Sequence, residues 1–485
     1  MLYMKNTIVY ILIAFLPTGY SAAAQTTAID YEKKIDSLFA EYKNTPGVAV
    51  AVVKNGAVVF KKGYGMANLG YEVPITPQTK FHIASVSKQF TAFSVYLLKK
   101  QGKISLEDDI RKYIPELPVY NKTIRIKHLL GHTSGLRDQW AILTLAGWQM
   151  EDVISTEHIL KLAARQKALN FEPGTRFGYC NTGYTLLAEA VSRISGQSFA
   201  AFTAANIFQP LGMVNTVFYD DLHTVLKNRA HSYELGKSGY TELKLNYSNV
   251  GATSLTTTVE DLAKWVNNFK RPVVGDEELM KDFNAASLLD NGDPVTWAAR
   301  PGDTIYHAKG QLLLQHKGVR RISHGGHDAG FRSALLRFPD SDLAVITLSN
   351  NEHYSVPSKT EPIADMYLGD EIRETVGTTA PTAPAAPAKT VPYTNTLADF
   401  EGAYYSHELA TTYHVKVKGD QLLMTHYRLS DMELEATAKD SFSGINSFAF
   451  QMVFTRDRQR VVGFEISNFG AKNVAFKKQT PATAP

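Results

Sequence analysis

The sequence predicts an α+β fold in which helices flank an antiparallel sheet, followed by a small all-β domain that resembles a barrel. Two observations support this prediction. β-rich segments stand at both ends of the region before residue 352, and helical patterns lie between them. Beyond residue 392 the chain consists almost entirely of short alternating segments separated by turns. Strands from both ends of one region can join in one sheet that the intervening helices cover.

The N-terminus has the three-part pattern of a secretory signal peptide. Lys5 precedes an apolar run over residues 8–16, and Ala22-Ala23-Ala24 offers a cleavage site before Gln25. This pattern predicts a cleavable signal over residues 1–24 and a secreted or periplasmic protein. The alternative, an uncleaved membrane anchor, is disfavoured because the apolar run is shorter than a comfortable membrane span.

The large region between the signal and residue 376 contains clear strand and helix patterns. An Asn55-Gly56 pair between two β-rich runs is a strong hairpin signal. Apolar residues at helical spacing, with glycine stops, indicate helices. The predicted strands are Val48–Val53, Ala57–Lys61, Ser333–Phe338 and Leu343–Ser349, and the predicted helices are Ser85–Lys100, Thr182–Ile194 and Val259–Phe269.

A segment rich in proline, alanine and threonine divides the chain. Residues 377–392 carry Pro381, Pro384 and Pro387 at every third position and have no apolar face to bury. This composition is typical of an extended, semi-rigid linker. The predicted domains are therefore a large N-terminal domain over 25–376 and a small β-barrel domain over 393–485. In the second domain apolar residues occupy every second position, as in strands with one buried face. They are Tyr413, Val415 and Val417 in one segment and Phe448, Phe450, Met452 and Phe454 in another.

Charge and cysteine content exclude several classes of protein. The net charge is +4 over 485 residues, without a dense block of Lys or Arg, so no nucleic-acid footprint is indicated. The chain has one cysteine, which rules out an intrachain disulfide and argues against a thiolate zinc site. We expect no cofactor, no nucleic-acid partner and no membrane span in the mature chain.

The first candidate motif is Ser85-Val86-Ser87-Lys88, at the start of a predicted helix. An ordinary helix cap would have Glu or Gln three residues after the serine, whereas Lys88 opposes the helix dipole there. Serine and lysine one turn apart lie on the same helix face. A partly desolvated Lys88 could accept the Ser85 proton, and the Ser85 backbone N–H could help to hold an oxyanion.

The second candidate motif is Tyr179-Cys180-Asn181, between a Pro-Gly turn and a predicted helix. In an extended segment Tyr179 and Asn181 point the same way and Cys180 points away from them. The phenol could transfer protons and the amide could orient a substrate carbonyl. We expect Cys180 to be a small buried packing residue.

The third candidate motif is His324-Gly325-Gly326-His327-Asp328-Ala329-Gly330, which leads into a predicted strand. Small residues on an edge strand allow a substrate backbone to approach closely. Two alternatives are weaker. Lys237-Ser238-Gly239 fits a K-[ST]-G pattern but is better explained as a hairpin tip. Zinc binding by His324 and His327 would need a third ligand and lacks the H-E-x-x-H context.

Taken together, these motifs resemble the serine β-lactamase-related hydrolases, the group that holds class C β-lactamases, D-alanyl-D-alanine carboxypeptidases, D-aminopeptidases and related esterases. The resemblance extends from about Ile35 to Asn351. It rests on the order and spacing of the three motifs and on five further segments, Phe81–Lys88, His128–Leu136, Pro210–Met213, Gly251–Leu255 and Phe338–Asp340. The region after the linker is similar to the lipocalin-like β-domain appended to some members.

The resemblance implies a role for each motif residue. Ser85 would be the acylated nucleophile, Lys88 its base and Tyr179 the proton shuttle. Asn181, His324 and Gly326 would contact the substrate. The backbone N–H groups of Ser85 and His327 would bind the oxyanion. One departure matters, because classical β-lactamases and carboxypeptidases have lysine where this chain has His324. A histidine is mostly neutral at pH 7, so it suits a substrate carboxylate poorly.

These observations predict an exported serine hydrolase that acts through an acyl-enzyme on amide or ester bonds, such as those of D-amino-acid peptides or small esters. Two alternatives stay open on the same fold: a β-lactamase, and a catalytically silent penicillin-binding or sensing module. An α/β-hydrolase is disfavoured because no G-x-S-x-G pentapeptide occurs. The expected partner is a small molecule or short peptide, and the sequence leaves open whether the chain forms a homo-oligomer.

Overall fold

The computed structural model describes residues 31–300, 303–373 and 396–480. The chain divides into a first compact unit, residues 1–40, and a second, residues 41–485. In the first unit residues 31–38 form a helix. The predicted signal peptide and the predicted linker at 377–392 lie outside the described residues, so the domain boundaries drawn from them stay predictions.

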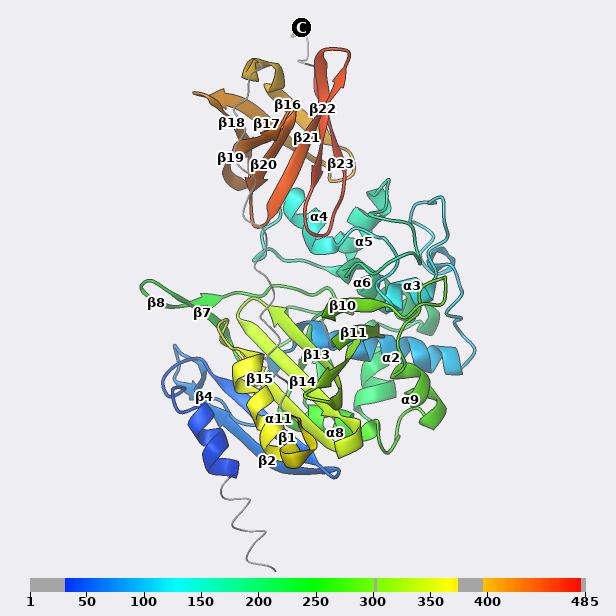
Figure 1. Ribbon diagram of the computed structural model, residues 1–485, viewed down its shortest axis with the longest axis vertical. Coiled ribbons are helices and arrows are strands. Elements are labelled where there is room, and N and C mark those ends of the chain that lie inside the picture. Colours follow the sequence, from blue (N-terminus) through cyan, green and yellow to red (C-terminus); the bar gives the residue numbers. More distant parts are fainter. Residues whose placement is uncertain (1–30, 301–302, 374–395, 481–485) are drawn as a thin grey trace, which may run out of the picture. The chain divides into compact units, whose positions relative to one another are not determined.

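An eight-stranded antiparallel sheet forms the centre of the region before the predicted linker (Figure 1). Its order is β10-β11-β12-β13-β14-β15-β1-β2, so the strands near the start of the region pair with those at its end. All seven residues of β15 are buried, and two helices, α8 (Val259–Asn268) and α11 (Glu361–Leu368), pack against it, as expected for a strand covered on two faces. The strands are β1 (Val48–Lys54), β2 (Ala57–Tyr64), β10 (Thr296–Arg300), β11 (Asp303–Ala308), β12 (Gln311–His316), β13 (Val319–Asp328), β14 (Phe331–Phe338) and β15 (Leu343–Ser349).

Helices and shorter strands complete this region. The α-helices are α2 (Ser87–Lys100), α3 (Ile126–Leu130), α4 (Gln139–Leu145), α5 (Thr156–Arg165), α6 (Asn181–Ser195), α7 (Phe199–Thr203), α8 (Val259–Asn268), α9 (Glu277–Phe283), α10 (Val356–Lys359) and α11 (Glu361–Leu368). A 3₁₀ turn, η1 (Ala84–Val86), precedes α2. The short strands are β3 (Met66–Asn68), β4 (Val73–Pro74), β5 (Phe81–His82), β6 (Val217–Phe218), β7 (Ser232–Gly236), β8 (Gly239–Leu243) and β9 (Leu255–Thr257).

The predicted elements are found close to their expected bounds. The helix predicted over 182–194 is α6, which ends at Gly196 with a φ of 69°, a left-handed conformation that glycine adopts without strain. Lys237-Ser238 forms the tip of the β7–β8 hairpin, as expected. The sequence pattern missed β10, β11 and β12, which extend the sheet beyond the third motif.

The C-terminal region is a closed eight-stranded barrel, so the predicted α+β fold with an all-β barrel domain is confirmed. Phe450, Met452 and Phe454 on β21 point into the barrel, whereas Phe448 precedes the strand and is partly exposed, contrary to the expected alternation. The strands are β16 (Gly402–Ser406), β17 (Thr411–Lys418), β18 (Gln421–His426), β19 (Leu429–Ala438), β20 (Ser441–Ile445), β21 (Ala449–Asp457), β22 (Arg460–Ser467) and β23 (Val474–Lys478).

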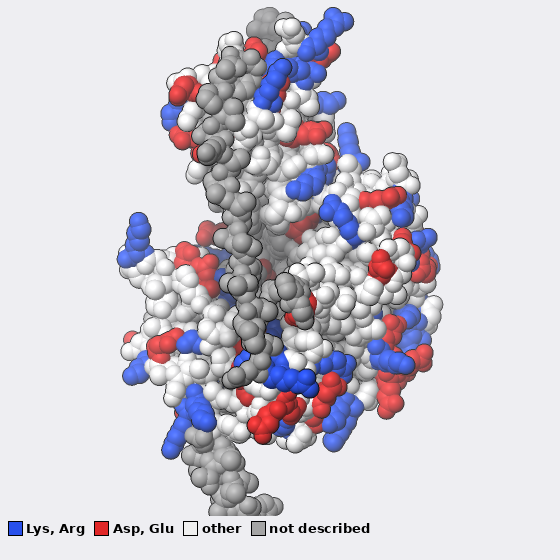
Figure 2. All heavy atoms as spheres, viewed as in Figure 1, with Lys and Arg blue, Asp and Glu red and all other residues white. Residues whose placement is uncertain are grey.

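The surface carries both signs of charge. Figure 2 shows acidic and basic side chains interspersed on the face in view, which fits the small net charge. Among the described residues, no helix is both long and apolar enough to cross a bilayer.

Candidate active site

The turn η1 presents Ser85, which is partly exposed, while the residues on either side of it are buried. Ala84 has a φ of 47°, which is costly for a residue with a side chain. The expectation that the helix begins at Ser85 was wrong, because α2 begins at Ser87 and Ser85 belongs to the preceding 3₁₀ turn. This tight turn holds Ser85 apart from the regular helix.

Lys88 lies on the first turn of α2 and is completely buried. Its Nζ lies 3.0 Å from the Ser85 Oγ, 2.8 Å from the Asn181 Oδ1 and 2.7 Å from the carbonyl oxygen of Ala252. Burial lowers the pKa of Lys88 to about 7, although the nearby carboxylates of Asp328 and Asp138 oppose this shift. A neutral amine can donate to Asn181 and Ala252 and still accept the Ser85 proton.

Tyr179 and Asn181 lie on the same side of their segment, as predicted. The Tyr179 hydroxyl donates to the Ser85 Oγ at 2.9 Å, and Asn181 accepts from Lys88. Burial raises the pKa of Tyr179 far above its usual range, so the phenol keeps its proton. Cys180 is buried, burial raises the pKa of its thiol to about 12, and it is therefore the packing residue that we expected.

The third motif lies on β13, which packs against the nucleophile turn. A Cβ on Gly326 would lie 2.2 Å from the carbonyl oxygen of Ile83, so only glycine permits this approach. The Ser333 hydroxyl on β14 donates to the same carbonyl at 2.8 Å. β13 is not an edge strand as a whole, because β12 pairs with it as far as Ser323. From His324 to Asp328 the described strand that pairs with β13 is β14 alone. This part of β13 therefore forms the sheet edge that was predicted for the motif.

The two histidines of this motif differ in environment. Burial lowers the pKa of His324 to about 4, so its imidazole is neutral at pH 7, and its Nδ1 lies 2.5 Å from the Gly325 carbonyl oxygen. His327, on the same strand, is more exposed, and its pKa is lowered mainly by partial burial. Ser85 and His327, whose N–H groups we expect to bind the oxyanion, both line one pocket.

A family model described as Beta-lactamase matches residues 35–368. The chain belongs to the beta-lactamase family. The predicted resemblance to serine β-lactamase-related hydrolases is thereby confirmed.

Curated relatives of this beta-lactamase-family chain include D-aminopeptidases. The protein from Brucella anthropi is 29% identical over 310 residues, which are 63% of this chain and 56% of the relative. The protein from Brucella canis is 28% identical over 310 residues, which are 63% of this chain and 57% of the relative. The chain thus spans little more than half the length of these relatives.

Solved structures share the fold at lower identity. The octameric penicillin-binding protein homologue from Pyrococcus abyssi has a TM-score of 0.62 at 22% identity, covering 93% of this chain and 99% of that one. The D-amino acid amidase from Ochrobactrum anthropi SV3, complexed with L-phenylalanine amide, has a TM-score of 0.57 at 22% identity, covering 70% of this chain and 97% of that one.

The pocket over Ser85 has a volume of about 500 Å³. It brings together Ser85, Tyr179, Asn181, His324, Gly326 and His327, while Lys88 lies buried beneath them. Sequence reasoning did not assign the remaining lining residues to the site, and two of them are tryptophans. They are Trp140, Thr253, Trp297, Leu312, Gly325, Asp328, Arg332, Ser333 and Val356.

Asp328 fixes the end of the third motif. Its Oδ2 accepts hydrogen bonds from Thr253 and, at 2.8 Å, pairs with His82 Nε2. Burial raises the pKa of Asp328, but these hydrogen bonds outweigh burial and lower the pKa, so the carboxylate stays ionised. Among the described residues, no group of three or more His, Cys, Asp and Glu side chains is arranged to hold a metal.

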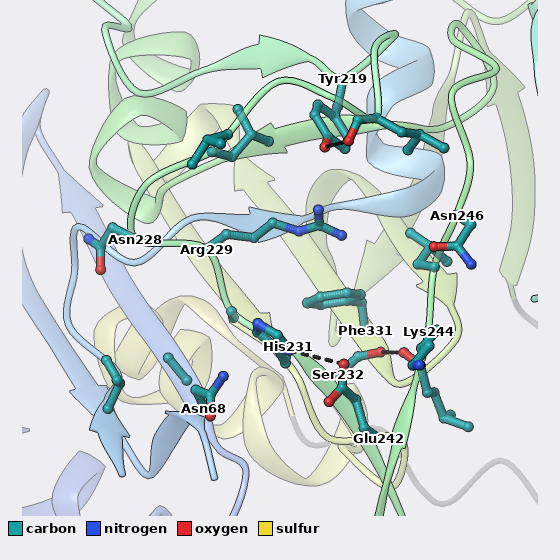
Figure 3. A pocket seen from close by; sticks show the side chains of 18 of the residues that line it. Asn68, Tyr219, Asn228, Arg229, His231, Ser232, Glu242, Lys244, Asn246 and Phe331 are labelled. Atoms are coloured by element: carbon teal, nitrogen blue, oxygen red, sulfur yellow. Dashed lines mark hydrogen bonds and ion pairs between the residues drawn. The ribbon is translucent and has the colours of Figure 1, made fainter. Parts of the chain in front are cut away.

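A second, larger hollow of about 620 Å³ lies elsewhere in the same region (Figure 3). It is lined by Asn68, Tyr219, Arg229 and Lys244, among others, and its His231 and Glu242 side chains pair at 3.0 Å. None of the predicted site residues lines it. Size alone therefore does not identify the catalytic pocket, whereas the chemistry around Ser85 does.

The state of Lys88 predicts how activity depends on pH. Below a pKa of about 7 the ammonium has no lone pair to accept the Ser85 proton, so kcat/KM should fall about tenfold per pH unit as the pH falls. Above it the amine is neutral and kcat/KM should level off. A pH–rate profile on a neutral ester substrate measures this acid limb. A profile that is flat from pH 5 to pH 9 would contradict Lys88 as the base.

Proposed function

We propose that this protein is a serine hydrolase that cleaves amide or ester bonds through an acyl-enzyme on Ser85. The observation that carries the proposal is the position of the Ser85 Oγ, which lies 3.0 Å from the Lys88 Nζ and 2.9 Å from the Tyr179 Oη. A hydroxyl held between a neutral amine and a protonated phenol has a base to accept its proton and a donor to orient its lone pairs.

The proposed reaction follows from these contacts. Ser85 Oγ attacks the substrate carbonyl carbon while its proton passes to Lys88 Nζ. The N–H groups of Ser85 and His327 stabilise the negative charge on the carbonyl oxygen. Tyr179 gives its proton to the leaving amine or alcohol and regains one from Lys88. A water molecule then hydrolyses the Ser85 ester and regenerates the enzyme.

For the substrate, we propose short D-amino-acid peptides, D-amino-acid amides or small acyl esters. The aromatic walls formed by Trp140 and Trp297 suit an apolar group. The neutral His324 offers no fixed cation to a substrate carboxylate. Arg332 also lines the pocket, but its Nη1 donates to two backbone carbonyls and its Nη2 lies 3.5 Å from Glu352. The D-aminopeptidase relatives support the same choice.

A hydrolysis panel tests the substrate class. D-alanine amide, a D-Ala-D-Ala peptide, p-nitrophenyl acetate and nitrocefin are compared by kcat/KM, with L-alanine amide as the stereochemical control. The absence of an ion pair with the substrate carboxylate weakens binding by roughly 2 kcal/mol or more. We therefore expect kcat/KM for nitrocefin to be at least about 30-fold lower than kcat/KM for the best amide or ester. A preference for nitrocefin would favour the β-lactamase alternative. No turnover of any substrate would favour the silent binding module.

Export and assembly are further proposals. The pattern at residues 1–24 supports a secreted or periplasmic location. The octameric Pyrococcus homologue, which has the same fold over nearly all of this chain, supports a homo-oligomer.

A further inference from the structure

The connection between strands β22 and β23 of the barrel, residues 468–473, contacts the segment just before α4. We infer that the C-terminal barrel is part of the catalytic apparatus, because this connection holds Asp138 in the position from which it orients Asn181 toward Lys88. This inference rests on the proposed function of Ser85 and Lys88. It assigns to Asp138 and Gly470 a positioning role, and to the barrel a role in the activity of the neighbouring domain.

Asp138 determines how the Asn181 amide is oriented. Its Oδ2 accepts hydrogen bonds from the backbone N–H of Asn181 at 2.6 Å and from the Asn181 Nδ2 at 2.9 Å. Because a carboxylate only accepts, the amide must turn its nitrogen toward Asp138 and its oxygen away. That oxygen is the Oδ1 that accepts from the Lys88 Nζ at 2.8 Å. The orientation of Asn181 therefore depends on the position of Asp138.

The barrel in turn holds Asp138. The Asp138 backbone N–H donates to the carbonyl oxygen of Gly470 at 2.8 Å, and the Asn468 Nδ2 donates to the carbonyl oxygen of Ala141 at 3.1 Å. A Cβ on Gly470 would lie 2.7 Å from the Cβ of Asp138 and 3.0 Å from that of Ala141. Neither atom is the far end of a flexible side chain, so any side chain at 470 must displace the segment itself.

Arg137, the neighbour of Asp138, fastens the same segment through a buried ion pair. Its side chain is 0% exposed, and its Nη1 lies 2.6 Å from the Oε2 of Glu408 in the barrel, whose side chain is 6% exposed. Its other nitrogens donate to the carbonyl oxygens of Lys472 and Asn473. A buried charge is tolerated only where partners surround it, and most of these partners come from the barrel.

Asp138 also acts on Lys88 through its charge. Both groups are buried, and the carboxylate opposes the loss of the lysine proton. Lys88 is also coupled to Asp328 and Cys180, which oppose that loss as well, and to the imidazoles of His132, His307 and His324, whose own pKa values are lowered by the lysine. Removing only the Asp138 charge should therefore lower the pKa of Lys88. A residue that merely supported the fold would leave the pH profile unchanged.

The test compares two full-length glycine variants. Gly470→Ala places a Cβ against Asp138. Gly444→Ala is the matched control, because its Cβ would lie 2.6 Å from the Phe450 ring inside the barrel and touch nothing in the catalytic region. We expect Gly470→Ala to lower kcat roughly 10- to 100-fold with KM changed less than about twofold. Gly444→Ala should keep the wild-type kcat. Equal kcat values for the two variants would overturn the inference.

A second variant covers the case in which Gly470→Ala does not fold. Asp138→Asn preserves the shape of the side chain and should shift the acid limb of the kcat/KM profile to lower pH, besides lowering kcat. An unshifted acid limb would overturn the inference. Failure of the proposed function gives a different result, because the wild-type protein itself would then show no turnover that depends on Ser85.

Discussion

Replacing Ser85 with alanine is expected to lower kcat by at least about 10⁴-fold, because removal of a catalytic nucleophile leaves only the contribution of binding and the oxyanion donors. The fold should persist, since within the described part of the chain the Ser85 side chain makes hydrogen bonds only with Lys88 and Tyr179, and it is partly exposed. We expect the free energy of unfolding to change by no more than about 1 kcal/mol. Steady-state kinetics on the best substrate of the panel, with denaturant unfolding, measures both quantities.

Ser94→Ala is the matched control for this prediction. Ser94 also lies on α2 and is buried, but among the residues that the structure describes its hydroxyl donates only to the Phe90 carbonyl oxygen, within the same helix. This variant should keep the wild-type kcat. A Ser85→Ala protein that retains more than about a tenth of the wild-type kcat would show that another group performs the chemistry.

Replacing Lys88 with methionine is expected to lower kcat by roughly 10²- to 10⁴-fold, the range for loss of a general base. Methionine fills similar space without a charge, so desolvation of a cation no longer opposes folding. The Asn181 Oδ1 and the Ala252 carbonyl oxygen, however, lose the Lys88 donor. This loss lowers the free energy of unfolding by about 1–3 kcal/mol for each buried group. The remaining activity should lack the acid limb near pH 7, which a pH–rate profile detects.

Lys309→Met is the control, because Lys309 is a second buried lysine whose pKa burial lowers, to about 8. Its Nζ donates to the backbone carbonyls of Asp282 and Ala285, and it does not line the catalytic pocket. Lys309→Met should keep both kcat and the acid limb. If it removed the acid limb while Lys88→Met kept it, the base would not be Lys88.

Local sequence patterns were sufficient to predict the pairs that lie close along the chain. Ser85 and Lys88 face one another because they are three residues apart across the junction of η1 and α2, and Tyr179 and Asn181 lie on either side of the extended residue Cys180. The sheet was predicted from strands at both ends of the region, and β1 does pair with β15. The neutral state of His324 followed from the residue type, and burial accentuates it.

The remaining parts of the site depend on tertiary contacts that no local pattern encodes. Asp138 looks like an ordinary helix cap, and it does cap α4, yet its second oxygen binds Asn181 more than 40 residues away. Trp297 comes from a strand that the pattern missed. The start of α2 was misplaced by two residues because Ala84 adopts a positive φ beside the closely packed β13, which overrides the ordinary capping preference.

The most direct test of the account is covalent labelling of the wild-type protein with a fluorophosphonate, followed by tandem mass spectrometry of the peptide that spans residues 81–88. Fragmentation distinguishes Ser85 from Ser87 in that peptide. We predict one adduct, on Ser85, that forms more slowly in Lys88→Met and is absent in Ser85→Ala. An adduct on another residue, or full hydrolytic activity in protein that carries no adduct after prolonged labelling, would contradict the assignment of Ser85 as the nucleophile.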